Sequence, residues 1–423
     1  MEGYVHIYAN LMMLVFAIGY FCIIFEHKCH VNKATSAILM AVILWSLQFA
    51  DQAFAEINKQ RFSEHLADVS QVILFLLGAV TIVETIHVHG GFALIANAIR
   101  LSSKKMCLWA VSILAFFLSS ILDNLTTTIV FVVIIKKLLD NVQDRWIFGS
   151  AVVIAANAGG AWSPIGDVTT TMLWIGGQVS SVALIKNLFV PSLVCLVAAT
   201  AVLSYSVSGV IQKKIVNKKE VIEPRGELVF AAGIASLAFV PIFKLATGLA
   251  PFMGILFSLG FMWLLCDLLH KNHDTRDHLR VPSIMPRIDF ASIFFFLGIL
   301  LSVNALETAG ILRQLAMWLD SAVSSKEVVA VFIGLVSAVI DNVPLVAGAM
   351  GMYDLELFRM DHPLWLLIAF CAGTGGSILI IGSAAGVAFM GLEKVDFFWY
   401  VKRVSFAAGF GYFVGIAAYF LLG

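Results

Sequence analysis

Asn157-Ala-Gly-Gly-Ala-Trp-Ser-Pro-Ile-Gly166 and Gly373-Thr-Gly-Gly-Ser-Ile-Leu-Ile-Ile-Gly382 share the spacing of a Gly-Gly pair and a final Gly, and both lie inside long apolar sequence. An Asp-Asn pair precedes each stretch, at 123–124 and at 341–342. This recurrence indicates an internal duplication. Backbone that leaves helical geometry inside a membrane must be buried in protein or line a wet cavity, and an ionisable group at that depth indicates function. The two stretches therefore predict a functional site at membrane depth.

The composition is that of a membrane protein with many spans. Hydrophobic residues make up 60% of the 423 residues, charged residues make up 13%, and the mean hydropathy is +0.95. The 27 basic residues equal the 27 acidic ones, so no face can neutralise a row of phosphates, and nucleic acid is excluded as a partner. Six scattered cysteines without a CxxC pair predict neither a disulfide framework nor a zinc site.

Eight apolar runs are long enough to be ordinary spans. They lie at about 5–25, 34–53, 69–90, 187–211, 228–247, 251–270, 290–309 and 401–422. Four further apolar segments are interrupted by Gly, Pro or paired polar residues. We expect two of them, 107–139 and 326–353, to be re-entrant hairpins, and the other two, 146–175 and 364–391, to be broken helices that cross the membrane.

This assignment gives five crossings to each half of the chain. An odd number turns the second copy upside down relative to the first, as in inverted-repeat transporters. The expected fold class is therefore an all-α polytopic membrane protein with two inverted repeats, residues 1–211 and 228–423. A polar linker at 212–227 joins them.

The lysine and arginine distribution tests this topology independently. With the N-terminus outside, the inside segments carry most of the 27 basic residues, as the positive-inside rule requires. The outside segments keep Lys59, Arg61, Lys186, Lys244, Arg313, Lys326 and Arg359. Both chain termini are thus expected outside, and we expect the membrane to be a bacterial inner membrane.

The two hairpin tips offer ligands for a hard cation. Carboxylate, amide, hydroxyl and carbonyl oxygens are the groups that alkali cations prefer. We expect sodium to be bound by the two Asp-Asn pairs, Asp123 with Asn124 and Asp341 with Asn342. The alternative is that these residues only cap the returning helices. The candidate tip residues are Ser120, Asp123, Asn124, Thr126, Ser337, Asp341 and Asn342.

The broken helices supply further candidates. We expect Gly159-Gly160 and Gly375-Gly376 to free the backbone from helical geometry, and Pro164 to keep the first helix broken. Asp167 opens the following half-helix, either as a simple N-cap or as a titrating acid, whereas its counterpart in the second copy is Ser383. The candidate residues here are Asn157, Gly160, Asp167, Thr374 and Ser377.

Two glutamates also correspond between the copies. Glu84-Thr85 and Glu307-Thr308 each precede a glycine that ends a span. Either they pair with the hairpins for structural reasons or they belong to an ion path. His87 and His89 are expected near the inner face as interfacial anchors, with pH sensing as the alternative.

The strings Asp123-Asn-Leu-Thr-Thr-Thr and Asn157-Ala-Gly-Gly-Ala-Trp-Ser-Pro-Ile-Gly-Asp167 resemble those of the NhaD-type sodium/proton antiporters of the ion transporter superfamily, and the likeness extends over nearly the whole chain. The resemblance implies a scaffold domain used for homodimerisation and a transport domain built from hairpins and broken helices. It also implies that sodium or lithium is bound near the midplane. Relatives that carry dicarboxylates have neutral Ser-Asn-Thr tips, whereas here Asp123 and Asp341 take the Ser positions.

The leading hypothesis is exchange of cytoplasmic sodium or lithium for external protons. A carboxylate buried at a hairpin tip favours a bound proton or cation over a bare charge, so the two ions compete for one site. The alternatives are an arsenite or oxyanion exporter and a sodium-coupled dicarboxylate transporter. The chain is expected to be a carrier with no catalytic residues and no cofactor, in contact with its ions and the lipid bilayer.

Overall fold

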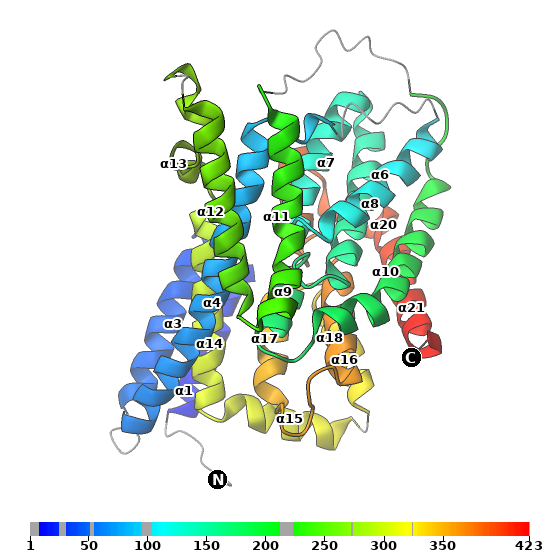
Figure 1. Cartoon of the computed structure of the whole chain (residues 1–423). Helices are drawn as coiled ribbons and strands as arrows, with labels where there is room; N and C mark the ends of the chain where they lie inside the picture. The colour runs from blue at the N-terminus through cyan, green and yellow to red at the C-terminus, as the bar shows by residue number, and fades with distance from the viewer. Residues whose placement is uncertain are drawn as a thin grey trace.

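Helices form every named element of the structure (Figure 1), a computed structural model that describes residues 8–24, 31–50, 55–94, 103–211, 223–271, 274–323 and 325–422. The linker expected at 212–227 therefore falls mostly outside the described residues. One isolated bridge, between Ser103 and Val210, joins the backbone just before residue 104 to the backbone near the end of the first half.

Among the residues that the structure describes, seven helices are long and apolar enough to cross a membrane. They are α3 (Lys33–Ala50), α4 (Ala55–Val88), α10 (Ser181–Ser204), α11 (Gly226–Thr247), α12 (Pro251–His270), α14 (Phe290–Thr308) and α21 (Ser405–Leu422). Each matches one run expected as an ordinary span, and the eighth run, 5–25, contains the shorter α1 (Ala9–Ile24). The prediction of an all-α polytopic membrane protein is confirmed.

The four interrupted segments form helix pairs at the expected places. The first hairpin consists of α6 (Lys104–Ser119) and α7 (Asn124–Leu138), and the second consists of α16 (Lys326–Val336) and α17 (Asn342–Met352). The broken helices are α8 (Val142–Ala161) with α9 (Val168–Ile175), and α18 (Pro363–Gly375) with α19 (Ala384–Glu393). Each Asp-Asn pair thus lies where a hairpin turns back.

Three features differ from the expected element bounds. The helix α4 begins well before residue 69, because its polar first part continues the helix beyond the apolar run. An amphipathic helix, α15 (Ile311–Ala322), precedes the second hairpin. The last expected span is divided into α20 (Phe397–Arg403) and α21. The connection from α12 to α14 contains η2 (Asp274–Leu279), α13 (Val281–Ile284) and η3 (Met285–Arg287).

The helices gather in two groups (Figure 1). We call α1, α3, α4, α11, α12 and α14 the span group, and α6 to α10 with α16 to α21, the hairpin group. Equivalent helices of the two halves make equivalent contacts: α3 packs on α14 as α12 packs on α4, and α6 packs on α8 as α16 packs on α18. The two hairpins lie toward opposite ends of the molecule. We call the end at which α4 and α12 finish the linker face.

The first pair of glycines lies inside α8, contrary to our expectation, whereas α18 ends at the second pair, with Gly376 as its C-cap. The helix α8 continues past Gly160, and the break follows at 162–167. A Cβ atom at Gly160 would lie 2.5 Å from the carbonyl oxygen of Gly166, and one at Gly375 would overlap the carbonyl oxygen of Gly334 in the second hairpin. These glycines therefore allow close backbone approach, which holds the hairpins and the breaks against the helices.

Candidate functional site

A cavity of about 300 Å³ separates the first hairpin from the span group. Its lining comes from α4, α7, α9, α11, α12, α14 and the start of α17. At the linker face the exposed side chains of Arg287 and Asp289 border it, and at its inner end Asp123, Asp167 and Asp341 line it. The cavity therefore connects the linker face to the acids of both copies.

Asp167 lies at the centre of the polar contacts at the inner end. Its side chain is 2% exposed and caps α9, because Oδ1 accepts hydrogen bonds from the backbone N–H and the hydroxyl of Thr169, each at 2.9 Å. The interpretation of Asp167 as an N-cap is correct in geometry. The other oxygen, Oδ2, faces the hairpin tips, so capping uses only half of the carboxylate.

The two hairpin tips meet at this second oxygen. Nδ2 of Asn124, from the first hairpin, donates to Oδ2 of Asp167 at 2.8 Å, and Nδ2 of Asn342, from the second hairpin, approaches it at 3.4 Å. Both asparagines are buried. Each is the first residue of its returning helix, so the preceding N-cap fixes its position. Side chains from both hairpins thus converge on one carboxylate, and Asn342 lies 175 residues from Asp167 in sequence.

Asn157 joins the broken helices of the two copies. Its Oδ1 accepts from Nδ2 of Asn124 at 3.0 Å, and its own Nδ2 donates to the hydroxyls of Ser377 at 2.9 Å and Ser383 at 3.0 Å. All four side chains are buried. This chain of hydrogen bonds gives every participating amide a partner at a depth where an unpaired polar group is costly.

Asp123 and Asp341 both line the cavity, and both also cap their own helices. The two carboxylate oxygens of Asp123 accept from Thr126, one from the backbone N–H at 2.7 Å and one from the hydroxyl at 2.6 Å. Asp341 accepts from the backbone N–H of Val343 at 3.2 Å. The capping alternative therefore describes real contacts of both residues, and their half-buried side chains still face the cavity.

Three predicted hydroxyls do not reach the acids. Ser120 donates to the carbonyl of Phe117 and Thr374 to that of Phe370, both within their own helical segments. Ser337 donates to the carbonyl of Ala372, across to α18. A hydroxyl satisfies a nearby backbone acceptor readily at this depth, so these groups serve the packing of the hairpins and broken helices.

The glutamates occupy different surroundings. Glu84 lines the cavity near the linker face together with His87. Glu307 lies toward the opposite end of α14, where its side chain borders Gly351 of the second hairpin. The position of Glu84 in the cavity lining agrees with a role in an ion path. The position of Glu307 beside Gly351 agrees with structural pairing to a hairpin.

Acidic side chains outnumber basic ones in the lining of the cavity. The described residues that line it include five carboxyl groups, those of Glu84, Asp123, Asp167, Asp289 and Asp341, against the basic side chains of His87 and Arg287. Both basic residues lie at the mouth. The interior therefore attracts cations and repels anions.

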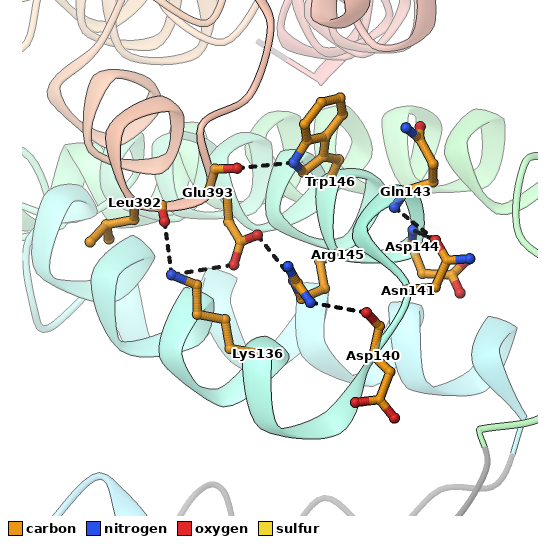
Figure 2. A network of polar contacts seen from close by, with 9 residues as sticks. All are labelled: Lys136, Asp140, Asn141, Gln143, Asp144, Arg145, Trp146, Leu392 and Glu393. Atoms are coloured by element: carbon orange, nitrogen blue, oxygen red, sulfur yellow. Dashed lines mark hydrogen bonds and ion pairs between the residues drawn. The ribbon is translucent and has the colours of Figure 1, made fainter.

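A second polar network ties the copies together at the linker face (Figure 2). The buried carboxylate of Glu393, at the end of α19, accepts from Nε of Arg145 at 3.0 Å and lies 3.6 Å from Nζ of Lys136. Nζ of Lys136 also donates to the carbonyl of Leu392, and Nε1 of Trp146 donates to the carbonyl of Glu393. The second broken helix is thus fastened to the first hairpin and to α8.

Sequence reasoning missed several contributors to the site. Ser119, not Ser120, is the counterpart of Ser337, since its hydroxyl donates to the carbonyl of Ala156 just as Ser337 donates to α18. The signal was available, because both serines lie four residues before an Asp-Asn pair. The sequence identifies Ser383 only as the counterpart of Asp167. Its contact with Asn157 has no local sequence signal.

Two helical hairpins and two broken helices that surround an acidic cavity, beside a group of membrane spans, define a polytopic membrane carrier. Comparison with known proteins identifies its relatives. The family described as "Citrate transporter" matches residues 20–361 of the chain. The chain belongs to this family and, within it, to the NhaD-type sodium/proton antiporters of the ion transporter superfamily.

The similar proteins extend over most of the chain. Sodium/proton antiporter 1 of Arabidopsis thaliana is 54% identical over 411 residues, which cover 96% of this chain and 71% of that protein. Sodium/proton antiporter 2 of the same plant is 49% identical over 413 residues, which cover 96% and 98%. The Na(+)/H(+) antiporter NhaD of Alkalimonas amylolytica is 30% identical over 441 residues, which cover 96% and 89%.

Proposed function

We propose that the protein is a secondary antiporter that exchanges sodium or lithium ions for protons at one site around Asp167. The observation that carries this proposal is the convergence of Asn124 and Asn342, one from each hairpin tip, on the same buried carboxylate. The names of the similar proteins, sodium/proton antiporters, support the same exchange.

The geometry suggests how one site serves both ions. A charged carboxylate that is buried without a counter-charge carries a desolvation penalty, and binding of either a proton or a cation removes that penalty. A cation at Oδ2 of Asp167 takes the place of the Nδ2 groups that face this oxygen, and the two tip amides turn so that their oxygens, ligands of the kind that sodium takes, face the cation. Asp123 and Asp341 add negative charge at the cavity wall. Since proton and cation occupy the same carboxylate, release of one permits binding of the other.

The charge of the cavity argues against the alternatives. An arsenite or other oxyanion exporter, or a dicarboxylate carrier, would bring further negative charge beside Asp123, Asp167 and Asp341. The basic groups Arg287 and His87 lie at the mouth and cannot neutralise an anion at the inner end. The acids therefore favour a cation as the cargo.

Alternating access requires the hairpin group to move relative to the span group. We infer that residues 1–211 and 228–423 are inverted repeats of five crossings each, that two copies of the chain form a homodimer, and that the linker face is cytoplasmic with both termini outside. The equivalent packing of α3 on α14 and α12 on α4 supports the repeats. The positive-inside rule supports the orientation. A bacterial inner membrane remains our proposal for the location.

The experiment is sodium-driven proton movement in everted vesicles, followed with a pH-sensitive dye from pH 6 to 10. We expect Asp167→Ser, which keeps an N-cap oxygen but cannot titrate, to abolish exchange, and Asp167→Glu to retain part of it with a shifted pH profile. Asp354→Asn, at an exposed acid outside the cavity, is the matched control. Exchange at the wild-type rate in Asp167→Ser would refute the proposal. Arsenite added in place of sodium tests the oxyanion alternative.

A further inference from the structure

A second, larger cavity of about 590 Å³ lies beside the second hairpin. Helices α1 and α14 form one wall, α16 and α17 form the other, and α15 closes the end away from the linker face. Apart from Tyr20, every side chain that lines it is apolar. Its lining includes Phe16, Val303, Leu306, Phe332, Pro344 and Gly348.

This lining makes water an unsuitable occupant. A buried water needs two to four polar partners, and the side chains of this lining offer only the hydroxyl of Tyr20 and the indole N–H of Trp318 at the exposed rim. An empty cavity of this size deprives all the lining side chains of dispersion contacts. The walls are helices at membrane depth, so the surrounding medium that can supply apolar contacts is the hydrocarbon of the bilayer.

The rim of the cavity faces that medium. Phe332 is 59% exposed and Trp318 is 63% exposed, and both belong to the lining. Trp318 lies on α15, an amphipathic helix that also exposes Arg313. A tryptophan and an arginine on an amphipathic helix are typical of the membrane–water boundary, where a lipid headgroup lies.

We propose that the acyl chain of a bilayer phospholipid occupies this cavity, inserted between α1 and α14 on one side and the second hairpin on the other. Its headgroup lies beside Arg313 at the surface of α15. A bound chain fills space that the protein leaves open, and it keeps water out of the crevice at the second hairpin in this conformation. The binding itself is independent of the transport reaction proposed above.

The test uses full-length protein in vesicles of a phosphatidylcholine whose acyl chain carries a photoreactive diazirine. Val303 and Leu306 are the diagnostic residues, because they are only 2% and 4% exposed and bulk lipid cannot touch them. After illumination, mass spectrometry is expected to find lipid adducts on both. Adducts restricted to exposed rim residues such as Phe332 would overturn the proposal.

Two glycines provide a matched pair of variants. A Cβ atom at Gly348, in the cavity wall, and one at Gly409, on α21 far from it, would each meet no atom within 4 Å. Gly348→Leu is expected to fill the cavity and reduce labelling of Val303 to the level of an unilluminated sample, whereas Gly409→Leu leaves it unchanged. Leu345→Phe fills the same space if Gly348→Leu does not fold. Unchanged labelling in a folded filling variant would refute acyl-chain binding.

Discussion

The crevices beside the two hairpins are equivalent in architecture and opposite in character. Beside the first hairpin, α4 and α11 face α7, and the cavity carries five carboxyl groups and leads to the linker face. Beside the second hairpin, α14 and α1 face α17, and the lining is almost entirely apolar. On the proposed duplication, the helices that form the two crevices are counterparts, so the contrast comes from the side chains that line them.

The same asymmetry appears inside the site. Asp167 and Ser383 both cap the second half of a broken helix, and a hydroxyl caps as well as a carboxylate. Only Asp167 carries a titratable group, and both hairpin tips are directed to it. On the proposed duplication, the two copies supply equivalent frameworks, and only the first places a titratable group at this position.

The largest expected difference concerns access of water. In a variant without the native cysteines, Ala79→Cys lines the acidic cavity and Gly348→Cys lines the apolar one. A charged methanethiosulfonate reagent should modify Ala79→Cys at least about tenfold faster, because the thiolate that reacts forms in water and not in hydrocarbon. Equal rates would show that both crevices are wet and would remove the contrast between them.

The two asparagines should contribute unequally to sodium affinity. Asn124 donates to Asp167 at 2.8 Å and Asn342 at 3.4 Å. We expect Asn124→Ala to raise the sodium concentration for half-maximal exchange about ten- to a hundredfold and Asn342→Ala by less than about tenfold, since the Asn124 amide lies nearer to the oxygen at which the cation binds and is the better placed ligand. A larger effect of Asn342→Ala would assign the main cation contact to the second hairpin.

Loss of the Glu393 network should lower stability and sodium affinity more than loss of an ion pair within one copy. Glu393→Gln leaves Lys136 and Arg145 without their buried partner and should cost about 1–3 kcal/mol of stability, reduced because both cations are partly exposed. It should also weaken sodium affinity, because α19 positions Ser383 against Asn157. Thermal unfolding and transport assays measure the two effects.

The matched control for that network is Asp144→Asn. Asp144 pairs with Lys104 at 2.6 Å inside the first copy. Its loss should leave sodium affinity unchanged. If Asp144→Asn and Glu393→Gln shift sodium affinity equally, the contact between the copies has no special role in positioning the site.

The smallest expected effect is a pH dependence of stability that arises at the linker face, just beyond the end of α4. Nε2 of His89 lies 3.0 Å from Nε2 of His270, so a positive charge on both rings at once is unfavourable. Burial lowers the pKa of His89 and His278 acts in the same sense, against the opposing effects of the Thr85 carbonyl and Glu223. An imidazole with a lowered pKa binds more protons when unfolded, so stability should fall as pH drops below about 6.5. His89→Gln should reduce that loss by about 2–4 °C in Tm.

Much of the fold could be predicted from the sequence because membrane spans and helix breaks have local signals. Apolar length identified the spans, and the repeated Asp-Asn and Gly-Gly strings located the hairpins and broken helices. The sequence could not show why glycine is needed at these positions, because the close approach of Gly375 to Gly334 depends on tertiary packing. The amphipathic α15 was missed because its apolar residues are interrupted by Arg313 and Gln314.

The sequence could name most of the side chains that meet around Asp167, but it could not show how they are arranged. The sequence drew attention first to Asp123 and Asp341 because they recur in both copies. The structure turns their carboxylates toward their own helices and directs both neighbouring asparagines to Asp167, which has no acidic counterpart. On the proposed mechanism, the repeated residues form the framework of the site, and Asp167, which departs from the repetition, is its centre.

The central claim is that a proton and a sodium ion compete for Asp167. The most direct test is proton release from purified protein in weakly buffered solution when sodium chloride is added, with potassium chloride as the control. The wild-type protein should release protons on addition of sodium, and Asp167→Asn should release none, because its side chain cannot carry the exchanged proton. Sodium-induced release from Asp167→Asn equal to that of the wild type would contradict the account.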